Sequence, residues 1–519
     1  MKIRPATLRI YQQVHTWSGL LAGFALFIAF YAGALSVFRS DIDRWQSPPW
    51  QDGGAAAQPA QTLLDRLVRE VPAARDDFSL MLPEGGSPPY LYWFSQGRLQ
   101  YLLAGADSHP STHGPDGRLA DFIYALHYSL AASTPGLYLM GIVSLLYGLA
   151  LVSGLIIHLP GMVRQLFALH PGSNLKRLWS DAHNAIGVLS LPFHIIFALT
   201  GALFCLSAVV LTAMGKLTFD PELPSRYAQS VSVTVMQADT PTHGPRQPLP
   251  VNDLLRYAKR AAADAGSPGF EPEYLHFTHY GQADGQVEVG GTPGHTLATY
   301  GTVRLDVADG RLLGASLGRH ASLDQSLSSS MYGLHFGNFG GRMVQWLYFL
   351  LGLAGAFLFY SGNLLWLESR RKRRHQQQPR SVRFMARATL GACLGSCLAI
   401  STVFAVTWAA AATERASDTL LIASFFGTWL GACGYAAWRP IPAASRELCL
   451  ATAWVTVLTA GLHLLYLLPR LWARTDSLTG SVLAVDLVGL LLGFGFFGLA
   501  RASHHRARHG DPHSVWARR

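Results

Sequence analysis

Four histidines of this sequence stand beside long apolar runs, where ionisable side chains are expensive. His15 precedes a run of apolar and small residues that ends near Phe38, and His183 precedes a second such run. His127 and His335 each follow a leucine shortly before a further run. Ionisable groups at membrane depth tend to face protein or a cofactor rather than lipid. These histidines are therefore candidate ligands; the alternative is an amphipathic side chain whose tip stays in the interfacial water.

The histidines have matching distances to glycines. Glycines follow both His15 and His183 by four and by eighteen residues, and a glycine follows both His127 and His335 by 27 residues. Eighteen residues are about five helical turns, so a histidine and its distant glycine share one face. The tetrapeptide DGRL also occurs twice. These matches predict a tandem duplication of helix, outer domain and helix over the first 370 residues.

A duplication whose halves start on the same side has its axis along the membrane normal. His15 and His183 then lie at one depth near the cytoplasmic face, and His127 and His335 lie together near the outer face. Paired histidines on facing helices form a site for a flat metal macrocycle, with neutral imidazoles as axial ligands and glycines beside the ring. The pattern predicts two haem b groups held by bis-histidine pairs. The chain has no C-x-x-C-H motif, so the haem is expected to be non-covalent.

Two histidines outside the repeat are further candidate ligands. His194 follows His183 by eleven residues, which in a continuous helix is about 16 Å along the axis and roughly 20° off the same face. His158, at the end of the second apolar run, could compete with His15 or His183. For His194 and His158 the alternative is a hydrogen bond to a helix carbonyl. The number of haems and the pairing of the six histidines stay open.

The composition is that of a polytopic membrane protein. Half of the 519 residues are apolar and only 14% are charged, whereas a soluble domain carries about 25% charged residues. The net charge of +10 does not indicate nucleic acid as a partner, because the basic residues cluster beside the apolar runs. The five cysteines also lie in or beside apolar segments, as small buried hydrophobic residues do.

Eight apolar runs are long enough to cross a hydrocarbon core of ~30 Å at ~1.5 Å per residue. The expected spans are 1–38, 136–158, 184–212, 342–367, 385–411, 419–438, 448–468 and 481–500. Basic residues gather at the N-terminus (Lys2, Arg4 and Arg9), in the loops 159–183 and 368–384 and in the tail 501–519. The positive-inside rule therefore places both termini and these loops in the cytoplasm. The last four spans form a C-terminal extension, 385–500.

The remaining segments, 39–135 and 213–341, are expected outside as two small α+β domains. TLLDRLVREV in the first and NDLLRYAKRAAADA in the second have the spacing of amphipathic helices. FSLML, YLYWF, YLHFTHY, GQVEVGG and TYGTVRLDV have the composition of strands. The Asp-Gly pair of each DGRL copy, at 116–119 and 309–312, is typical of a hairpin turn.

The sequence resembles the PepSY-associated transmembrane family. The resemblance covers about residues 1–375 and is carried by H-x-W-x-G-L entering the first span, L-H before the second and fourth, and AHNAIG with ALTG in the third. Some members of that family are haem-containing ferric-siderophore reductases of the bacterial inner membrane, related to the ferrioxamine reductase. The resemblance supports His15, His127, His183 and His335 as haem-associated positions and implies PepSY-like outer domains.

The expected function is electron transfer across the inner membrane to a ferric siderophore or another ferric chelate. No G-x-G-x-x-G fingerprint follows a strand, so the electron donor is expected to be a membrane quinol or a separate cytoplasmic reductase. Two alternatives stay open, a haem-free permease for iron or siderophore and a PepSY-type regulatory membrane protein. The C-terminal extension holds one histidine, His463, which we expect to be structural, like Cys393 and Cys397.

Overall fold

The computed structural model describes residues 4–518, apart from several segments. The segments outside the description are 47–59, 84–87, 105–108, 113–117, 160–174, 232–244, 295–296, 298–299, 373–376, 412–416 and 472–476. The chain forms two compact units. The first comprises Met1–Gln46, Gly117–Leu206 and Leu347–Arg519, and the second comprises Ser47–Asp116 and Ser207–Trp346. Each unit is described by itself.

Eight described helices are long and apolar enough to cross a membrane, which confirms the polytopic prediction. These apolar stretches are Pro5–Ser36, Ser133–His158, Leu191–Leu217, Gly341–Arg370, Arg380–Ala410, Asp418–Trp438, Ile441–Pro469 and Val482–His509. They belong to α1 (Pro5–Ser36), α5 (Ser133–His158), α8 (Leu191–Leu217), α12 (Gly341–Arg370), α13 (Arg380–Thr389) with α14 (Gly395–Ala411), α15 (Asp418–Trp438), α16 (Ile441–Leu471) and α17 (Ser477–His509).

The predicted third span is interrupted. Residues 175–189 form α7 (Leu175–Leu189), which carries His183, and α8 starts anew at Leu191. Pro192 lies at the start of α8, where the missing N–H and the fixed φ of proline suit the first turn of a helix but not a helix interior. His183 and His194 therefore lie on different helices, and the prediction of one continuous helix through both residues is wrong.

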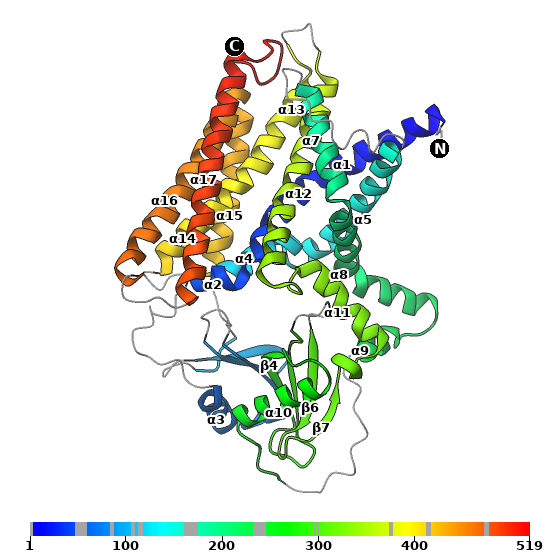
Figure 1. Ribbon diagram of the computed structural model, residues 1–519, viewed down its shortest axis with the longest axis vertical. Coiled ribbons are helices and arrows are strands. Elements are labelled where there is room, and N and C mark those ends of the chain that lie inside the picture. The colour runs from blue at the N-terminus through cyan, green and yellow to red at the C-terminus, as the bar shows by residue number, and fades with distance from the viewer. Residues whose placement is uncertain are drawn as a thin grey trace. The chain divides into compact units, whose positions relative to one another are not determined.

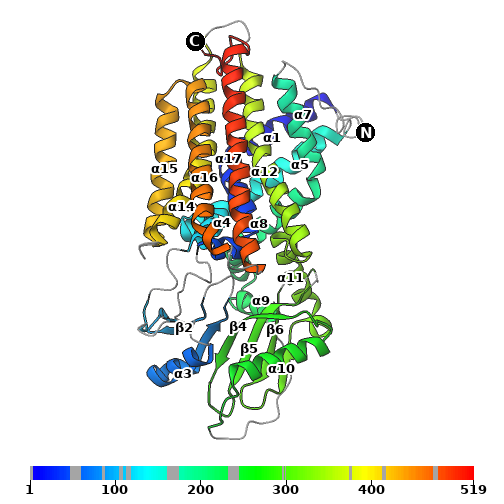
Figure 2. The same cartoon turned by 60° about the vertical axis from the view of Figure 1, so that its left-hand side comes forward.

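The last four spans pack on one another in the first unit. Figures 1 and 2 show α14, α15, α16 and α17 side by side, with α16 and α17 in close contact along their lengths. A short helix after α1, α2 (Arg39–Gln46), packs against α17, α14 and α4 (Leu119–Ser129). The start of the chain is thus joined to the C-terminal extension within one unit.

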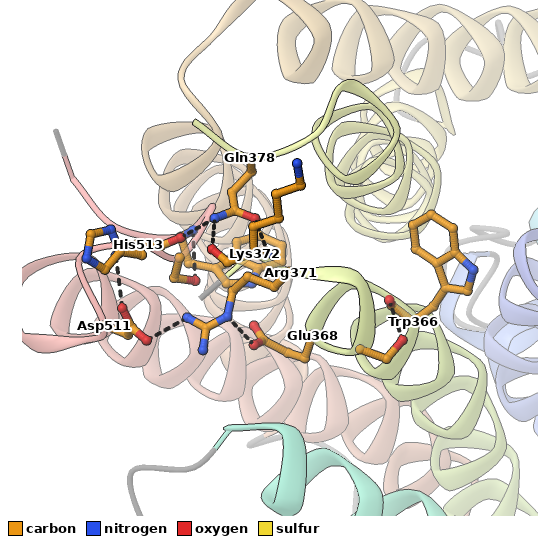
Figure 3. Close-up of polar contacts among 10 residues, drawn as sticks. Trp366, Glu368, Arg371, Lys372, Gln378, Asp511 and His513 are labelled. Carbon is orange, nitrogen blue, oxygen red and sulfur yellow. Dashed lines mark hydrogen bonds and ion pairs between the residues drawn. The ribbon is translucent and has the colours of Figure 1, made fainter. Parts of the chain in front are cut away.

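A polar cluster fastens the residues after α17 to the end of α12 (Figure 3). The Arg371 guanidinium forms ion pairs with Glu368 at 3.2 Å and with Asp511 at 2.8 Å. The Gln378 side-chain amide donates to the carbonyl oxygens of Lys372, at 2.9 Å, and His513, at 2.8 Å. This tail clasp, Arg371 with Glu368, Gln378, Asp511 and His513, holds both predicted cytoplasmic segments together.

The described residues of the second unit form one antiparallel sheet of seven strands in the order β3-β2-β1-β4-β5-β6-β7. The strands are β1 (Asp77–Met81), β2 (Tyr90–Ser95), β3 (Arg98–Leu103), β4 (Glu271–Thr278), β5 (Gln286–Thr292), β6 (Gly301–Asp306) and β7 (Leu312–Ala315). The predicted helices are present as α3 (Ala60–Glu70) and α10 (Val251–Asp264), which pack with the strands around one core. Figure 2 shows both helices beside the sheet.

The two outer segments share this sheet, which differs from the prediction of two separate domains. Strands β1 and β4 pair antiparallel from Asp77 opposite Thr278 to Met81 opposite Tyr274, and the rings of Phe78 and Phe277 stack 4.9 Å apart. The pairing covers two edges that separate sheets would leave with unpaired backbone groups. The second DGRL copy turns between β6 and β7, with Gly310 at φ +73°.

The first DGRL copy does not lead into a strand. Asp116 and Gly117 lie outside the described residues, and Leu119 opens helix α4. A similar helix, α11 (Leu323–Phe336), precedes α12. The second unit also contains the short helix α9 (Leu223–Val231).

Candidate functional site

His15 on α1 and His183 on α7 lie beside each other, as the sequence predicts. Their ring centres are 6.2 Å apart and their planes are nearly perpendicular, at 81°. An imidazole nitrogen lies about 1 Å from its ring centre and about 2 Å from a metal that it binds. Two imidazoles on opposite sides of one metal ion therefore have centres roughly 6 Å apart. The observed separation matches that arrangement.

The same kind of partner orients each ring. His15 Nδ1 lies 2.8 Å from the carbonyl oxygen of Ala150, and His183 Nδ1 lies 3.1 Å from that of Leu358. A carbonyl oxygen only accepts hydrogen bonds, so Nδ1 carries the proton and Nε2 keeps its lone pair. Among the described residues, neither Nε2 has a hydrogen-bond partner. A histidine that ligates a metal is usually held in this way.

Glycines make room for these rings. A Cβ added to Gly154 would lie 2.9 Å from Cε1 of His15, and one added to Gly362 would lie 3.4 Å from Cε1 of His183. Each glycine is one helical turn after the carbonyl that its histidine contacts. We expected the repeated glycines to make room for a macrocycle, whereas these two lie against an imidazole.

Two serines complete the matching contacts, and the sequence analysis missed them. Ser153 Oγ donates to the carbonyl of Ala150 at 3.1 Å, and Ser361 Oγ donates to the carbonyl of Leu358 at 2.8 Å. Ser361 Oγ also lies 3.1 Å from Nδ1 of His183. The dipeptide Ser-Gly in both spans is the sequence signal that could have identified these serines.

His127 has a third contact of this kind. Its Nδ1 lies 2.8 Å from the carbonyl oxygen of Ala29 on α1, and a Cβ on Gly33 would lie 2.6 Å from the same nitrogen. A tight turn sets the direction of α4, since Leu130 and Ala131 both have positive φ. His127 thus faces α1 near its outer predicted end, away from the His15 contact.

The partner predicted for His127 lies in the other unit. His335 is near the end of α11, a helix with a capping box between Ser322 and Gln325 and with Gly337 at its C-cap. Because the two units are described separately, the pairing of His127 with His335 stays a prediction.

His194 lies in a buried, hydrogen-bonded position. Its Nδ1 is 2.5 Å from the Tyr147 hydroxyl and its Nε2 is 2.9 Å from Ser190 Oγ. The rings of Phe30 and Phe193 lie within 5.9 Å of it, measured between ring centres. Both nitrogens are engaged, so this arrangement resembles the predicted alternative of a hydrogen-bonded histidine more than a free ligand.

His158 closes α5, one turn after Gly154. It lies within electrostatic range of both His15 and His183. It is therefore close to the inner pair, and its prediction as a competing ligand stays open.

Two histidines are too few ligands for a free metal ion but suffice for a metal that a macrocycle already binds. Among the described residues, no three or more His, Cys, Asp or Glu side chains are grouped to hold a metal ion. A porphyrin supplies four nitrogens and needs only two axial ligands, which His15 and His183 can provide. Gly19, one turn after His15, has open space where a Cβ would stand. The residues present thus fit haem.

Comparison with known proteins agrees with this architecture. Residues 12–369 match the family described as the PepSY-associated TM region. The chain is also 28% identical over 284 residues to an uncharacterised protein of Pseudomonas aeruginosa, PA4219, an alignment that covers 53% of this chain and 69% of the relative. Because the family match spans more than half of its length, this chain belongs to the PepSY-associated transmembrane family.

Proposed function

We propose that this protein is a haem-containing reductase of the bacterial inner membrane. It passes electrons outward to a ferric siderophore or another ferric chelate and releases Fe(II), with both of its termini in the cytoplasm. The observation that carries the proposal is the His15–His183 pair, whose rings lie 6.2 Å apart with both Nδ1 atoms bonded to carbonyls.

The chain's own residues have defined tasks at this site. His15 and His183 would hold the haem iron through Nε2, and the carbonyls of Ala150 and Leu358 fix the tautomer that leaves this nitrogen available. When bound, the haem supplies a centre that accepts and gives up one electron at a time. The equivalent contacts of the two histidines support the tandem repeat as well.

Aromatic side chains fill the middle of the first unit, beyond the inner pair. Phe30 packs against Tyr147 and Phe359, with ring centres 5.8 and 5.1 Å away. This cluster excludes water from the space between His183 and the level of His127. His127, with His335 as its predicted partner, is the proposed place for a second haem.

The reaction delivers one electron to each ferric ion: Fe(III) in the chelate becomes Fe(II), and no bond of the chelator itself breaks. Siderophores bind iron through hard oxygen ligands, which hold the ferrous ion less tightly. The shared sheet of the second unit belongs to the predicted outer side, where the chelate is taken up.

The test is a measurement of bound haem. The full chain, expressed with ample haem and purified in detergent, is expected to give a reduced-minus-oxidised haem b spectrum with two haems per chain. His15→Ala and His183→Ala are each expected to remove one haem, because a single imidazole is a poor anchor. His505→Ala, an exposed histidine on α17, is the matched control and is expected to keep both.

Activity is measured separately from cofactor content. The reduced protein, mixed without oxygen with a ferric siderophore, is expected to reoxidise as a ferrous chelator traps the released iron. A correctly folded but colourless protein would favour the permease or the regulatory alternative. Full haem content in both histidine variants would contradict the assignment of the ligands.

A further inference from the structure

The C-terminal extension contains a buried histidine that the proposed haem sites do not use. His463 on α16 and Asp486 on α17 are 0% and 1% exposed. His463 Nδ1 lies 2.7 Å from Asp486 Oδ2, and Trp45 Nε1 on α2 donates to Asp486 Oδ1 at 2.7 Å. This cluster, the His463–Asp486 dyad with Trp45, joins three helices of the first unit.

The far nitrogen of this histidine has no partner. Nε2 of His463 is buried and makes no hydrogen bond with any described residue. A buried polar atom of this kind calls for a ligand, because leaving it unpaired is costly. With Nδ1–H donated to the carboxylate, Nε2 accepts a hydrogen bond; once Nε2 is protonated, the same atom donates one. The missing partner is therefore a group that can offer either a hydroxyl or a carbonyl.

The surroundings of the dyad are aromatic. The Trp45 ring centre lies 4.6 Å from that of His463, and the Trp408 ring centre lies 6.1 Å away in a perpendicular orientation. Phe404 packs on Trp45 at 5.3 Å. Flat aromatic walls with one polar atom suit a planar ring with a polar edge. Among molecules dissolved in a membrane, a quinol has that shape, carries hydroxyls when reduced and carries carbonyls when oxidised.

We propose that His463 binds the head group of a membrane quinol and accepts a proton as the quinol is oxidised. Oxidation of one quinol to quinone releases two electrons and two protons. The first proton goes from the bound hydroxyl to Nε2 of His463, and Asp486 stabilises the imidazolium that results. The second leaves by the same nitrogen after the first has been passed to solvent. The two electrons reduce two ferric ions to ferrous ions, and this destination alone rests on the function proposed above.

The place of the dyad in the fold agrees with this role. Helix α2, which carries Trp45, contacts α17, α14 and α4. Helix α4 carries His127. Helix α2 thus contacts both α17, which carries Asp486, and the helix that carries His127. This gives the C-terminal extension a task, as the entry point of electrons.

Binding is tested without reference to haem. The full chain in liposomes is exposed to a photoreactive azidoquinone, and the labelled peptides are identified by mass spectrometry. The wild-type protein is expected to be labelled in α2, α14 or α16, and an excess of short-chain ubiquinol is expected to suppress the labelling. His463→Gln is expected to lower it at least fivefold, whereas the matched change His505→Gln leaves it unchanged.

A second variant guards against misfolding. Trp408→Leu removes one aromatic wall but leaves the hydrogen bonds of the dyad in place, and it is also expected to lower the labelling. Labelling that is absent in the wild type, that lies on other helices, or that is equal in wild type and His463→Gln would overturn the proposal.

An activity measurement separates this proposal from the proposed function. Reduction of a ferric siderophore is driven either by short-chain ubiquinol or by dithionite. His463→Gln is expected to slow the quinol-driven reaction at least tenfold and to leave the dithionite-driven reaction unchanged. A wild-type protein that is inactive with dithionite would contradict the reductase function, while equal quinol rates in wild type and variant would contradict the quinol site.

Discussion

Two groups of histidines in the first unit have different hydrogen-bond partners at Nδ1. Nδ1 of His15 and Nδ1 of His183 each form a hydrogen bond with a backbone carbonyl of a neighbouring span. Nδ1 of His463, in the C-terminal extension, forms a hydrogen bond with the carboxylate of Asp486. A carbonyl fixes the tautomer and adds no charge, whereas a carboxylate also stabilises the protonated ring. The partner of Nδ1 thus distinguishes a candidate metal ligand from a candidate proton acceptor.

The surroundings of the rest of each ring also differ between the His15–His183 pair and His463. The ring centres of His15 and His183 lie at the distance expected for two imidazoles that bind one metal ion, and Gly19, one turn after His15, has open space where a Cβ would stand. The ring of His463 is buried beside those of Trp45 and Trp408, and its Nε2 has no partner among the described residues. Histidines of similar sequence setting, each in or beside an apolar run, therefore take their chemistry from the helix packed against them.

The largest expected effect is on the dyad. Asp486→Leu would remove the acceptor of both Trp45 and His463, leaving two buried N–H groups unpaired. Breaking a buried pair from one side costs about 3–5 kcal/mol of folding free energy. Unfolding in detergent, monitored by the loss of the helical signal, measures this cost in free energy. Leu487→Ala at the adjacent exposed position is the control, and a loss below about 1 kcal/mol would indicate that the dyad is not a stabilising contact.

The next largest effect is expected at Gly154, which leaves space for the His15 ring. Gly154→Ala would place a methyl group 2.9 Å from Cε1 of His15, so the ring must shift. Overpacking of this kind costs about 1–3 kcal/mol, and we expect the variant to lose a large part of the inner haem while it keeps the outer one. Gly148→Ala, on the same helix with nothing within 4 Å, is the matched control. Equal haem content in the two variants would contradict the geometry.

A smaller effect is expected from the second hydrogen bond of His183. Ser361→Ala removes the hydroxyl 3.1 Å from Nδ1 but keeps the carbonyl of Leu358. One neutral hydrogen bond contributes about 1 kcal/mol, so haem dissociation should accelerate about fivefold. Ser153→Ala is the comparison, because Ser153 bonds the carbonyl of Ala150 and not His15 itself. Transfer of haem to an apo-globin measures both rates; equal acceleration would show that the serines act only on the helix.

The smallest effect is expected at the tail clasp, which joins the end of α12 to the residues after α17. Partial burial alone would raise the pKa of Asp511, but the His513 N–H and the Arg371 guanidinium outweigh it and lower that pKa below its ordinary value. A lowered pKa means that the ionised group stabilises the fold above the pKa of the unfolded chain, about 4. That stabilisation is lost as the pH falls through the folded pKa.

Asp511→Asn should imitate the acid form of the clasp at neutral pH. Since an exposed ion pair contributes about 0–1 kcal/mol, we expect faster proteolysis after α17 with no loss of haem. Limited proteolysis between pH 3 and pH 7 measures the difference. A variant with wild-type cleavage rates at neutral pH would show that the ion pair of Asp511 with Arg371 does not hold the tail.

The sequence by itself determined the elements of this protein. Eight long apolar runs predict eight spans, since backbone groups in lipid must be paired within a helix, and the described residues contain eight such helices. Amphipathic and alternating patterns located α3, α10 and five of the seven strands. The spacing of histidines and glycines also predicted that His15 and His183 lie at equal depth on neighbouring helices. In the structure their rings lie beside each other.

Only the tertiary structure decided which neighbour each side chain received. The pairing of β1 with β4 joins segments almost 200 residues apart, and no local pattern encodes it. Gly154 and Gly362 were found by spacing, but that they lie against imidazoles depends on how α5 and α12 pack against α1 and α7. His463 looked structural in the sequence, because its chemistry depends on Asp486 and Trp45, which only packing brings to it. Periodicity encodes the conformation of a segment, whereas a hydrogen bond across helices depends on the distance and angle at which separate segments pack.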